Sequence, residues 1–325
     1  MSQTKTDFRG SEVTDFLRCR KKYDYAWVQN LEPKQRDKKL TIGSAIHKFL
    51  EYYYISPIYP QVAVDTMLKY ILDNSDGMDE FEFEEMNDLC LNIVTNYMKQ
   101  WDLDFETYEV VATEMPFSVR LNADMVYTGT IDLLLKDRDG HIWLVDHKTT
   151  NAIDIYEKNS EMDRQISRYW AALELGGRKI HGFIYNIILK DYPVPPKVLK
   201  SGALSKDKSQ KTTYELYSKA IVEHDLKEED YADFLQLLQD QPKEFFRRTK
   251  VERSQAERDA AIAELEQVIE DIQINTERMV PKWYRNITKD CSWDCPFKSL
   301  CVAEMDGSNA DHIRNELFQV KEEQE

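Results

Sequence analysis

Residues 129–150 read GTIDLLLKDRDGHIWLVDHKTT, and this stretch decides the fold. Two largely apolar runs, TIDLLLK and HIWLVDHKTT, are separated by the polar segment DRDG, which is the pattern of a β-hairpin. Both faces of both runs are mainly apolar. The sheet that contains them should therefore be covered by other elements on both sides.

The turn of this hairpin determines which residues lie opposite each other. A type I turn followed by a left-handed glycine is a common three-residue hairpin loop, and Gly140 suits the left-handed position. With Gly140 closing the loop, Asp137 pairs with His141, and counting back places Asp132 directly opposite Asp146. Opposed residues of antiparallel strands share a face, with Cβ atoms about 5 Å apart. The register therefore predicts two neighbouring carboxylates.

A metal site is the chemistry that these side chains indicate. Lys148 lies two residues beyond Asp146 and points to the same face. Two carboxylates so close repel each other unless a cation lies between them. Mg²⁺ or Mn²⁺ bound there can polarise a phosphodiester, and the lysine can hold a water or stabilise charge on the phosphate. His147 points the other way, but its backbone carbonyl could reach the metal. For Asp132 alone, an ordinary charge at an exposed strand end is the alternative.

The pattern around the hairpin indicates an α/β chain. Residues 1–107 read as mostly helical, and residues 108–205 hold the predicted core. Residues 206–280 read as a helical, acidic insertion or arm. Residues 281–305 form a cysteine-rich segment that completes the domain, and 306–325 a tail whose last residues, FQVKEEQE, fray. Helix starts are expected at three capping pairs: Ser160 with Asp163, Thr212 with Glu215, and Ser254 with Glu257.

Composition limits the classes of function. The chain has 325 residues, 42% of them hydrophobic, and a formal net charge of -16. That charge excludes a protein that binds nucleic acid over its whole surface, but not one with a local basic groove. No apolar run approaches the roughly 18 residues of a membrane helix and no signal region is visible, so a cytoplasmic protein is expected. Candidate basic patches are Arg18, Arg20, Lys21 and Lys22; Lys190, Lys197 and Lys200; and Arg247, Arg248 and Lys250.

The hairpin resembles the G-x-x-D…D-x-K core of the PD-(D/E)xK nucleases, especially their RecB-like and CRISPR-associated exonuclease branch. Gly129, Asp132, Asp146 and Lys148 fill that pattern. The resemblance covers roughly residues 8–190 and resumes at 282–302. It implies a restriction-endonuclease-like core, in which a central mixed sheet is flanked by helices.

Two further motifs occur in the order that this branch has along the chain. GSAIH, with Gly43 and His47, resembles the motif of a metal-binding histidine. QISRY, with Gln165 and Tyr169, resembles a Q-x-x-x-Y motif whose residues share a helix face and would contact DNA or brace the lysine. A structural histidine and a polar helix rim are the respective alternatives. Glu114, in ATEMPF, either joins the metal site or lies on the surface at a strand end.

Three of the five cysteines crowd into CSWDCPFKSLC, as Cys291, Cys295 and Cys301. In a cytosolic protein such a cluster indicates metal binding more than disulfides, and Cys19 or Cys90 could complete it. FLRCRKKYDYAW resembles the early cysteine segment of iron–sulfur RecB-like nucleases, which implies a [4Fe-4S] cluster held by Cys19 and the three late cysteines. Such a cluster would be a staple between the two ends of the chain. Zinc is the alternative metal, and Cys90 reads as an ordinary buried residue.

The resemblance implies a deoxyribonuclease that uses Mg²⁺ or Mn²⁺, with His47, Asp132, Asp146 and the His147 carbonyl around the metal. The substrate implied is single-stranded DNA or a DNA end, cut as an exonuclease in recombination, repair or replication. A CRISPR-associated or helicase-partnered nuclease is one alternative. The chain has no P-loop, so a helicase would be a separate protein. A non-catalytic iron–sulfur DNA-binding module is the other alternative.

Overall fold

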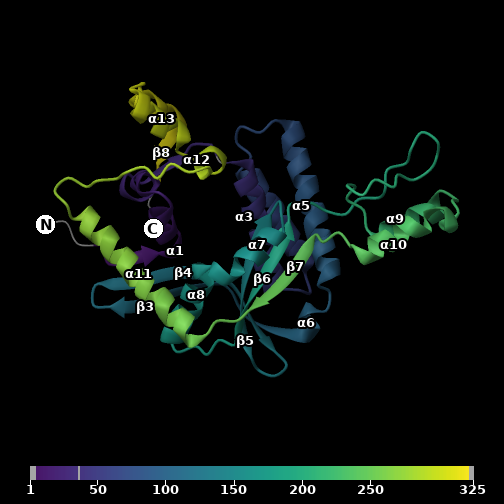
Figure 1. Cartoon of the computed structure of the whole chain (residues 1–325), viewed down its shortest axis with the longest axis horizontal. Coiled ribbons are helices and arrows are strands. Elements are labelled where there is room, and N and C mark those ends of the chain that lie inside the picture. Colours follow the sequence, from purple (N-terminus) through teal and green to yellow (C-terminus); the bar gives the residue numbers. More distant parts are fainter. Residues whose placement is uncertain (1–4, 36, 322–325) are drawn as a thin grey trace.

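A six-stranded mixed sheet organises the molecule, and the computed structural model describes residues 5–35 and 37–321 (Figure 1). The strands are β1 (Asp7–Arg9), β3 (Tyr108–Asn122), β4 (Met125–Asp137), β5 (Ile142–Thr150), β6 (Gly182–Leu189) and β7 (Phe246–Val251). Their order is β1-β4-β5-β6-β7, and β3 also pairs with β4. The β1–β4 and β5–β6 pairs are parallel and the others antiparallel. The predicted α/β fold with a mixed central sheet is confirmed.

The hairpin has the predicted register. Leu133 pairs with Val145 and Lys136 with Ile142, while Gly140 closes the turn at φ +82°. The β4–β5 pairing ends at Leu133, and the same edge of β4 pairs with β1 only from Val126 to Thr128. The edge of β4 is therefore unpaired in between, and Asp132 lies at the point where the strands separate.

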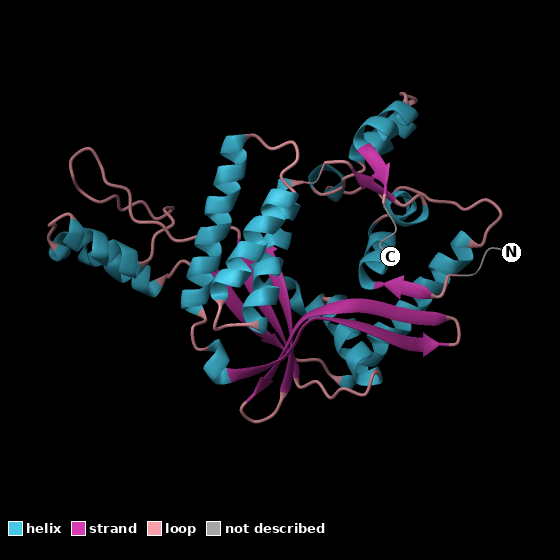
Figure 2. Ribbon diagram, turned by 180° about the vertical axis from the view of Figure 1, so that it is seen from behind, coloured by secondary structure: helices cyan, strands magenta, loops and turns pink. Residues whose placement is uncertain are grey.

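Helices cover both faces of the sheet, as the apolar pattern of the hairpin requires (Figure 2). On one face α3 (Lys38–Ile55), α4 (Pro60–Asp73) and α5 (Glu80–Gln100) pack over Leu133 and Val145. On the other face α1 (Gly10–Arg18), α8 (Arg164–Leu175) and α11 (Gln255–Thr276) pack over Leu134 and Leu144. Successive residues of each strand thus point into different cores, which explains why both faces of the hairpin are apolar.

The helix starts follow the expected capping chemistry with some shifts. Ser254 and Glu257 form the predicted capping box of α11. Thr213, not Thr212, caps α9 (Tyr214–Glu223). Asp163, not Ser160, caps α8; Ser160 lies in a 3₁₀ turn (Ser160–Met162) that follows α7 (Asp154–Asn159). In both helices a residue close to the predicted one supplies the side-chain oxygen that accepts a hydrogen bond from the first helix amides.

Within residues 1–107, which were predicted to be mostly helical, the first helical segment is interrupted at Cys19. Between α1 and α2 (Arg20–Tyr23), Cys19 has an extended backbone at φ -162°, and a π-helical turn (Asp24–Val28) follows α2. Cys19 is therefore presented by a kink and not by a regular helix. The short α6 (Asp104–Thr107) leads into β3.

The segment expected as one helical arm, residues 206–280, is divided by the structure. Its first half forms α9, a 3₁₀ turn (Glu228–Tyr231) and α10 (Ala232–Asp240), which have a small core of their own. Its second half belongs to the main fold, because β7 pairs with β6 and α11 packs on α8. The sequence of β7, FRRTKV, does not predict a strand, because its long polar side chains do not alternate with apolar ones.

The C-terminal segment folds back on the N-terminal one. It contains α12 (Asp290–Trp293), α13 (Lys298–Asp306), α14 (Ala310–Leu317) and β8 (Phe318–Val320). β8 pairs with β2 (Leu31–Pro33), so the expectation of fraying is wrong for residues 318–320, while residues 322–325 lie outside the described residues. None of the described helices combines the length and apolar character that a bilayer crossing requires.

Candidate active site

Three potential metal ligands converge where β4 and β5 separate. His47 comes from α3, Glu114 from β3 and Asp132 from β4, and one ligand atom of each lies within 4.8 Å of the other two. His47 Nδ1 is 3.8 Å from Asp132 Oδ2. An imidazole and two carboxylates suit a divalent cation such as Mn²⁺ or Mg²⁺.

Glu114 enters this group through an unusual backbone conformation. Its neighbours Thr113 and Met115 pair with Leu133 and Ile131, so Glu114 lies across from Asp132. Its φ is +42°, in the left-handed region that a glutamate rarely adopts. Such strain persists only where the surroundings impose it, and it concentrates at functional sites. The sequence allowed Glu114 either to join the metal site or to lie on the surface at a strand end. In the structure it lies beside His47 and Asp132.

Asp146 and Lys148 form a pair beside this group. Lys148 Nζ lies 2.7 Å from Asp146 Oδ2, and that buried oxygen accepts no hydrogen bond of good geometry. Asp132 Oδ2 accepts a hydrogen bond from the backbone N–H of His147 at 2.8 Å, so its side chain spans the gap where the strand pairing has ended. Asp146 is buried, and its second oxygen is also engaged, by Gln165.

Gln165 fixes the pair from α8. Its Oε1 accepts from Lys148 Nζ at 3.1 Å, and its Nε2 donates to Asp146 Oδ1 at 3.3 Å. Tyr169, one turn further, packs edge-on against Phe117, with ring centroids 5.5 Å apart. Gln165 therefore has contacts that brace the lysine, whereas Tyr169 contacts Phe117 and Gln165.

Glycines at two positions allow the elements to approach. A Cβ on Gly129 would lie 2.7 Å from the ring of Phe117, and one on Gly43 would lie 3.0 Å from Thr149 Oγ1. Gly43 thus lets α3 pack closely on β5, one turn before His47. At both motif positions, a residue larger than glycine would crowd a neighbouring side chain.

His147 points into the opposite core, as its position on the strand predicts. Its ring is buried, its Nδ1 lies 2.8 Å from Asn186 Nδ2, and it stacks on Tyr54. Burial is the main cause that holds the pKa of His147 well below its usual range. A neutral ring whose Nδ1 accepts from Asn186 fits this environment. The backbone of His147 faces the site, where it interacts with the ring of His47.

Burial and crowded charge shift the pKa values of the site. Burial, with Asp132 adding to it, raises the pKa of both Asp146 and Glu114 to about 7. Burial lowers the pKa of His47, and Lys148 adds to that effect while Asp132 opposes it. Although burial acts to lower the pKa of Lys148, the attraction of Asp146 and Asp132 raises it. Without a cation this site concentrates negative charge, so it favours binding one.

A network that the sequence did not reveal supports the strand of His147. Arg248, on β7, donates to both oxygens of Asp104 at 2.6 Å and to the hydroxyls of Tyr54 and Tyr97. Arg248 Nε donates to Asn186 Oδ1 at 3.3 Å, and this asparagine contacts His147. The expected basic patch at Arg247, Arg248 and Lys250 is therefore not a free groove, because Arg248 is buried in an ion pair and Arg247 is paired with three carboxylates.

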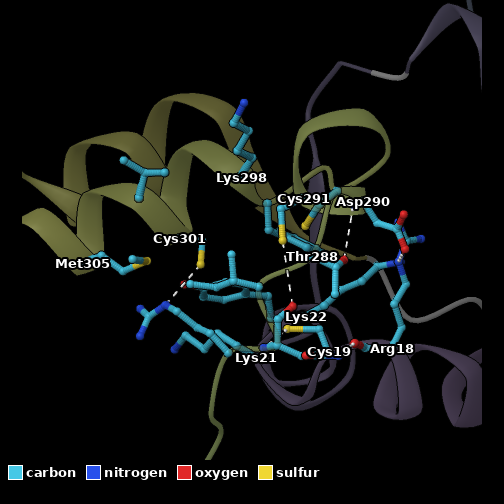
Figure 3. Close-up of a pocket in the computed structure, with 17 residues that line it drawn as sticks. Arg18, Cys19, Lys21, Lys22, Thr288, Asp290, Cys291, Lys298, Cys301 and Met305 are labelled. Atoms are coloured by element: carbon cyan, nitrogen blue, oxygen red, sulfur yellow. Dashed lines mark hydrogen bonds and ion pairs between the residues drawn. The ribbon is translucent and has the colours of Figure 1, made fainter.

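The four proposed cluster cysteines come together from the two ends of the chain. Cys19, Cys291, Cys295 and Cys301 line one cavity of about 180 Å³, and Figure 3 shows Cys19 facing Cys291 and Cys301 across it. Two of the sulfurs accept hydrogen bonds, Cys301 from Arg285 Nε at 3.2 Å and Cys19 from the Asn286 N–H at 3.4 Å. Cys90 lies apart, on the buried face of α5, and burial raises its pKa to about 12.

The mixed sheet and the acidic group beside a lysine define a nuclease of the α/β class. The chain belongs to the PD-(D/E)XK nuclease superfamily, whose family model matches residues 10–302. Two solved structures are similar at 11% identity. One is SSO0001, with a TM-score of 0.35 over 93% of this chain and 89% of that one. The other is a "Putative exonuclease" from Eubacterium rectale, with a TM-score of 0.40 over 88% and 92%. None of the curated proteins compared with the chain matches it.

Proposed function

We propose that this nuclease is a metal-dependent DNA exonuclease that acts on single strands or DNA ends. The observation that carries the proposal is the convergence of His47, Glu114 and Asp132 beside the Asp146–Lys148 pair. These residues come from separate elements, so their meeting is a product of the fold and not of local sequence. Recombination, repair or replication is the setting that the family resemblance favours.

The donor set fits a divalent cation. Asp146 Oδ2 is a buried carboxylate oxygen paired with the Lys148 ammonium, and the three converging side chains offer nitrogen and oxygen ligands. We assign the cation to His47, Glu114, Asp132 and Asp146, with the backbone carbonyl of His147 as a further ligand. When bound, it would supply Lewis-acid polarisation of the scissile phosphodiester and of the attacking water.

Lys148 and Gln165 would do the remaining work in the reaction. Because the pKa of Lys148 is raised, its ammonium stays charged and can orient the attacking water or stabilise charge that develops on the phosphate. Gln165 holds this ammonium and Asp146 in fixed relative positions through one side chain. We therefore assign Lys148 to the chemistry and Gln165 to positioning.

We further propose that the four cysteines hold a [4Fe-4S] cluster, as in the iron–sulfur RecB-like branch. The four cysteines line one cavity and come from segments at the two ends of the chain. A cluster held there would join residue 19 to the far end of the chain.

One experiment tests the active site. Wild type and Lys148→Ala are compared on end-labelled single- and double-stranded DNA with Mg²⁺ and with Mn²⁺. Lys136→Ala is the matched control, because Lys136 lies on β4 in a surface ion pair with Glu109. We expect cleavage by wild type and by the control, and none by Lys148→Ala. Equal cleavage by all three proteins would exclude the assignment.

The same preparations test the alternatives. A broad visible absorption band that disappears in Cys295→Ser supports the cluster, whereas a colourless protein that carries zinc contradicts it. Cleavage without any added partner counts against an obligate helicase-coupled or CRISPR-associated nuclease. A protein that binds DNA but leaves it uncut with Mn²⁺ would be the non-catalytic module.

A further inference from the structure

A small folded unit is inserted between β6 and β7, two adjacent strands of the sheet. It projects from the sheet beside α5 (Figures 1 and 2). α9 and α10 pack around Tyr217, Tyr231 and Phe234, all of them buried, in a core separate from those of the main domain. A unit with its own core can hold an exposed segment in a defined shape.

That exposed segment is residues 193–213, here called the finger. Its two sides are joined by hydrogen bonds from Val194 N–H to Lys211 O and from Ser205 N–H to Lys197 O. At its tip Gly202 has a φ of +83°, which closes the turn. The helical base holds the finger, since the Tyr231 hydroxyl accepts from the Leu204 N–H and the Tyr217 hydroxyl donates to Ser205 O.

The finger is basic in an acidic protein. Between residues 193 and 213 the sequence has five lysines and one acidic residue, whereas the whole chain has a net charge of -16. All five lysines are exposed. Lys211 pairs with Asp191 and Lys206 donates to a backbone carbonyl, but Lys197, Lys200 and Lys208 have no carboxylate partner among the described residues. Three free ammonium groups on an ordered segment form a surface that attracts polyanions.

The helical base has the opposite charge. Its 3₁₀ turn begins with Glu228, Glu229 and Asp230, all exposed. A polyanion that approached the unit would be attracted by the lysines of the finger and repelled by the carboxylates of the base.

The root of the finger lies next to the strand that carries the candidate catalytic pair. Lys190, the first residue after β6, donates its N–H to Thr150 O at 2.7 Å. Thr150 is two residues beyond Lys148 on β5. The insertion therefore leaves the sheet at the same strand ends where the site lies.

We propose that the finger binds the phosphate backbone of the DNA strand at a distance from the scissile bond, an inference that rests on the function proposed above. Phosphates recur along the strand at every nucleotide, so a row of unpaired lysines can bind them without reading the sequence. The finger would hold the strand while the active site cuts, and the acidic base would repel it.

The reach of the finger limits the length of strand that the test needs. Lys200 lies eleven residues beyond Leu189, so the chain between them spans at most about 40 Å when extended. That distance corresponds to at most about twelve nucleotides at the roughly 3.4 Å spacing of stacked bases. A strand of 30 nucleotides can therefore contact both sites, whereas one of four nucleotides has too few phosphates to contact the active site and all three lysines.

The test uses the triple variant Lys197→Ala/Lys200→Ala/Lys208→Ala in the full chain. Its matched control, Lys69→Ala/Lys219→Ala/Lys227→Ala, removes three positive charges from α4 and from the acidic base. Binding of fluorescein-labelled dT30 is measured by anisotropy in EDTA, across a range of salt concentrations. Cleavage of 30-mer and 4-mer DNA is measured separately with Mn²⁺.

We expect the finger variant to bind dT30 roughly 100-fold more weakly at about 0.1 M salt, with a salt slope smaller by about two, because each lost phosphate contact removes about 0.7 from the slope. Its cleavage of the 30-mer should fall while that of the 4-mer stays unchanged. The same affinity and slope in the finger variant and the control would overturn the inference, including the case in which the finger binds an acidic protein instead. If wild-type protein binds dT30 through the finger but cuts no DNA, the proposed nuclease activity is overturned, while the inferred DNA binding by the finger is retained.

Discussion

The buried ion pair between Arg248 and Asp104 makes the sharpest stability prediction. The Asp104 side chain is 6% exposed and that of Arg248 13%. In Arg248→Met, Asp104 would remain as a buried carboxylate that has lost its cation. Breaking one side of a buried pair costs about 3–5 kcal/mol in unfolding free energy. Because the Tyr54 hydroxyl still donates to Asp104 at 2.6 Å, we expect the lower end of that range.

This energy converts into a measurable melting shift. Unfolding entropy near the transition is about 2.1 cal/mol/K per residue, so the 325 residues give about 0.7 kcal/mol/K. A loss of about 3 kcal/mol therefore lowers Tm by about 4 °C. Differential scanning calorimetry of the metal-free protein measures this shift directly.

A neighbouring arginine is the control. Arg247, on the same strand, pairs with Asp154, Glu157 and Glu244 at the surface. Exposed pairs contribute about 0–1 kcal/mol, so Arg247→Met should lower Tm by about 1.5 °C or less. The double variant Asp104→Asn/Arg248→Met should recover part of the loss, because no unpaired charge remains. Equal melting shifts for Arg247→Met and Arg248→Met would refute the reasoning.

Two further predictions concern the site itself. Since the pKa values of Asp146 and Glu114 are raised to about 7, both carboxyls are largely protonated below that pH and must lose protons when a cation binds. Mn²⁺ affinity should thus fall as pH drops below about 7, and calorimetry at pH 6.5 in two buffers of different ionisation enthalpy should detect about one to two released protons; zero release would contradict the shifts. Gly129→Val should overpack the Phe117 ring and destabilise the protein by about 1–3 kcal/mol, and Phe117→Leu in the same chain should restore much of the stability. Additive losses in the double variant would show that the clash is not the cause.

Several features could be predicted because their causes are local. The hairpin register follows from one turn and one glycine, so placing Asp132 and Asp146 on neighbouring strands needed no tertiary information. The capping box at Ser254 and Glu257 is equally local. β7 escaped prediction because its neighbours in the sheet, and not its own periodicity, make it a strand.

Sequence alone was enough to predict the hairpin, the α/β class and the candidate residues of the site. Tertiary structure alone decided which of them meet. It placed Glu114 across from Asp132 by an unusual backbone angle, and it buried Arg248, one residue of a candidate basic patch. It also divided the supposed arm between the main core and the separate helical unit of α9 and α10. The physical reason is that register and capping depend on near neighbours in the chain, whereas burial and ion pairing depend on which distant segments the packing brings together.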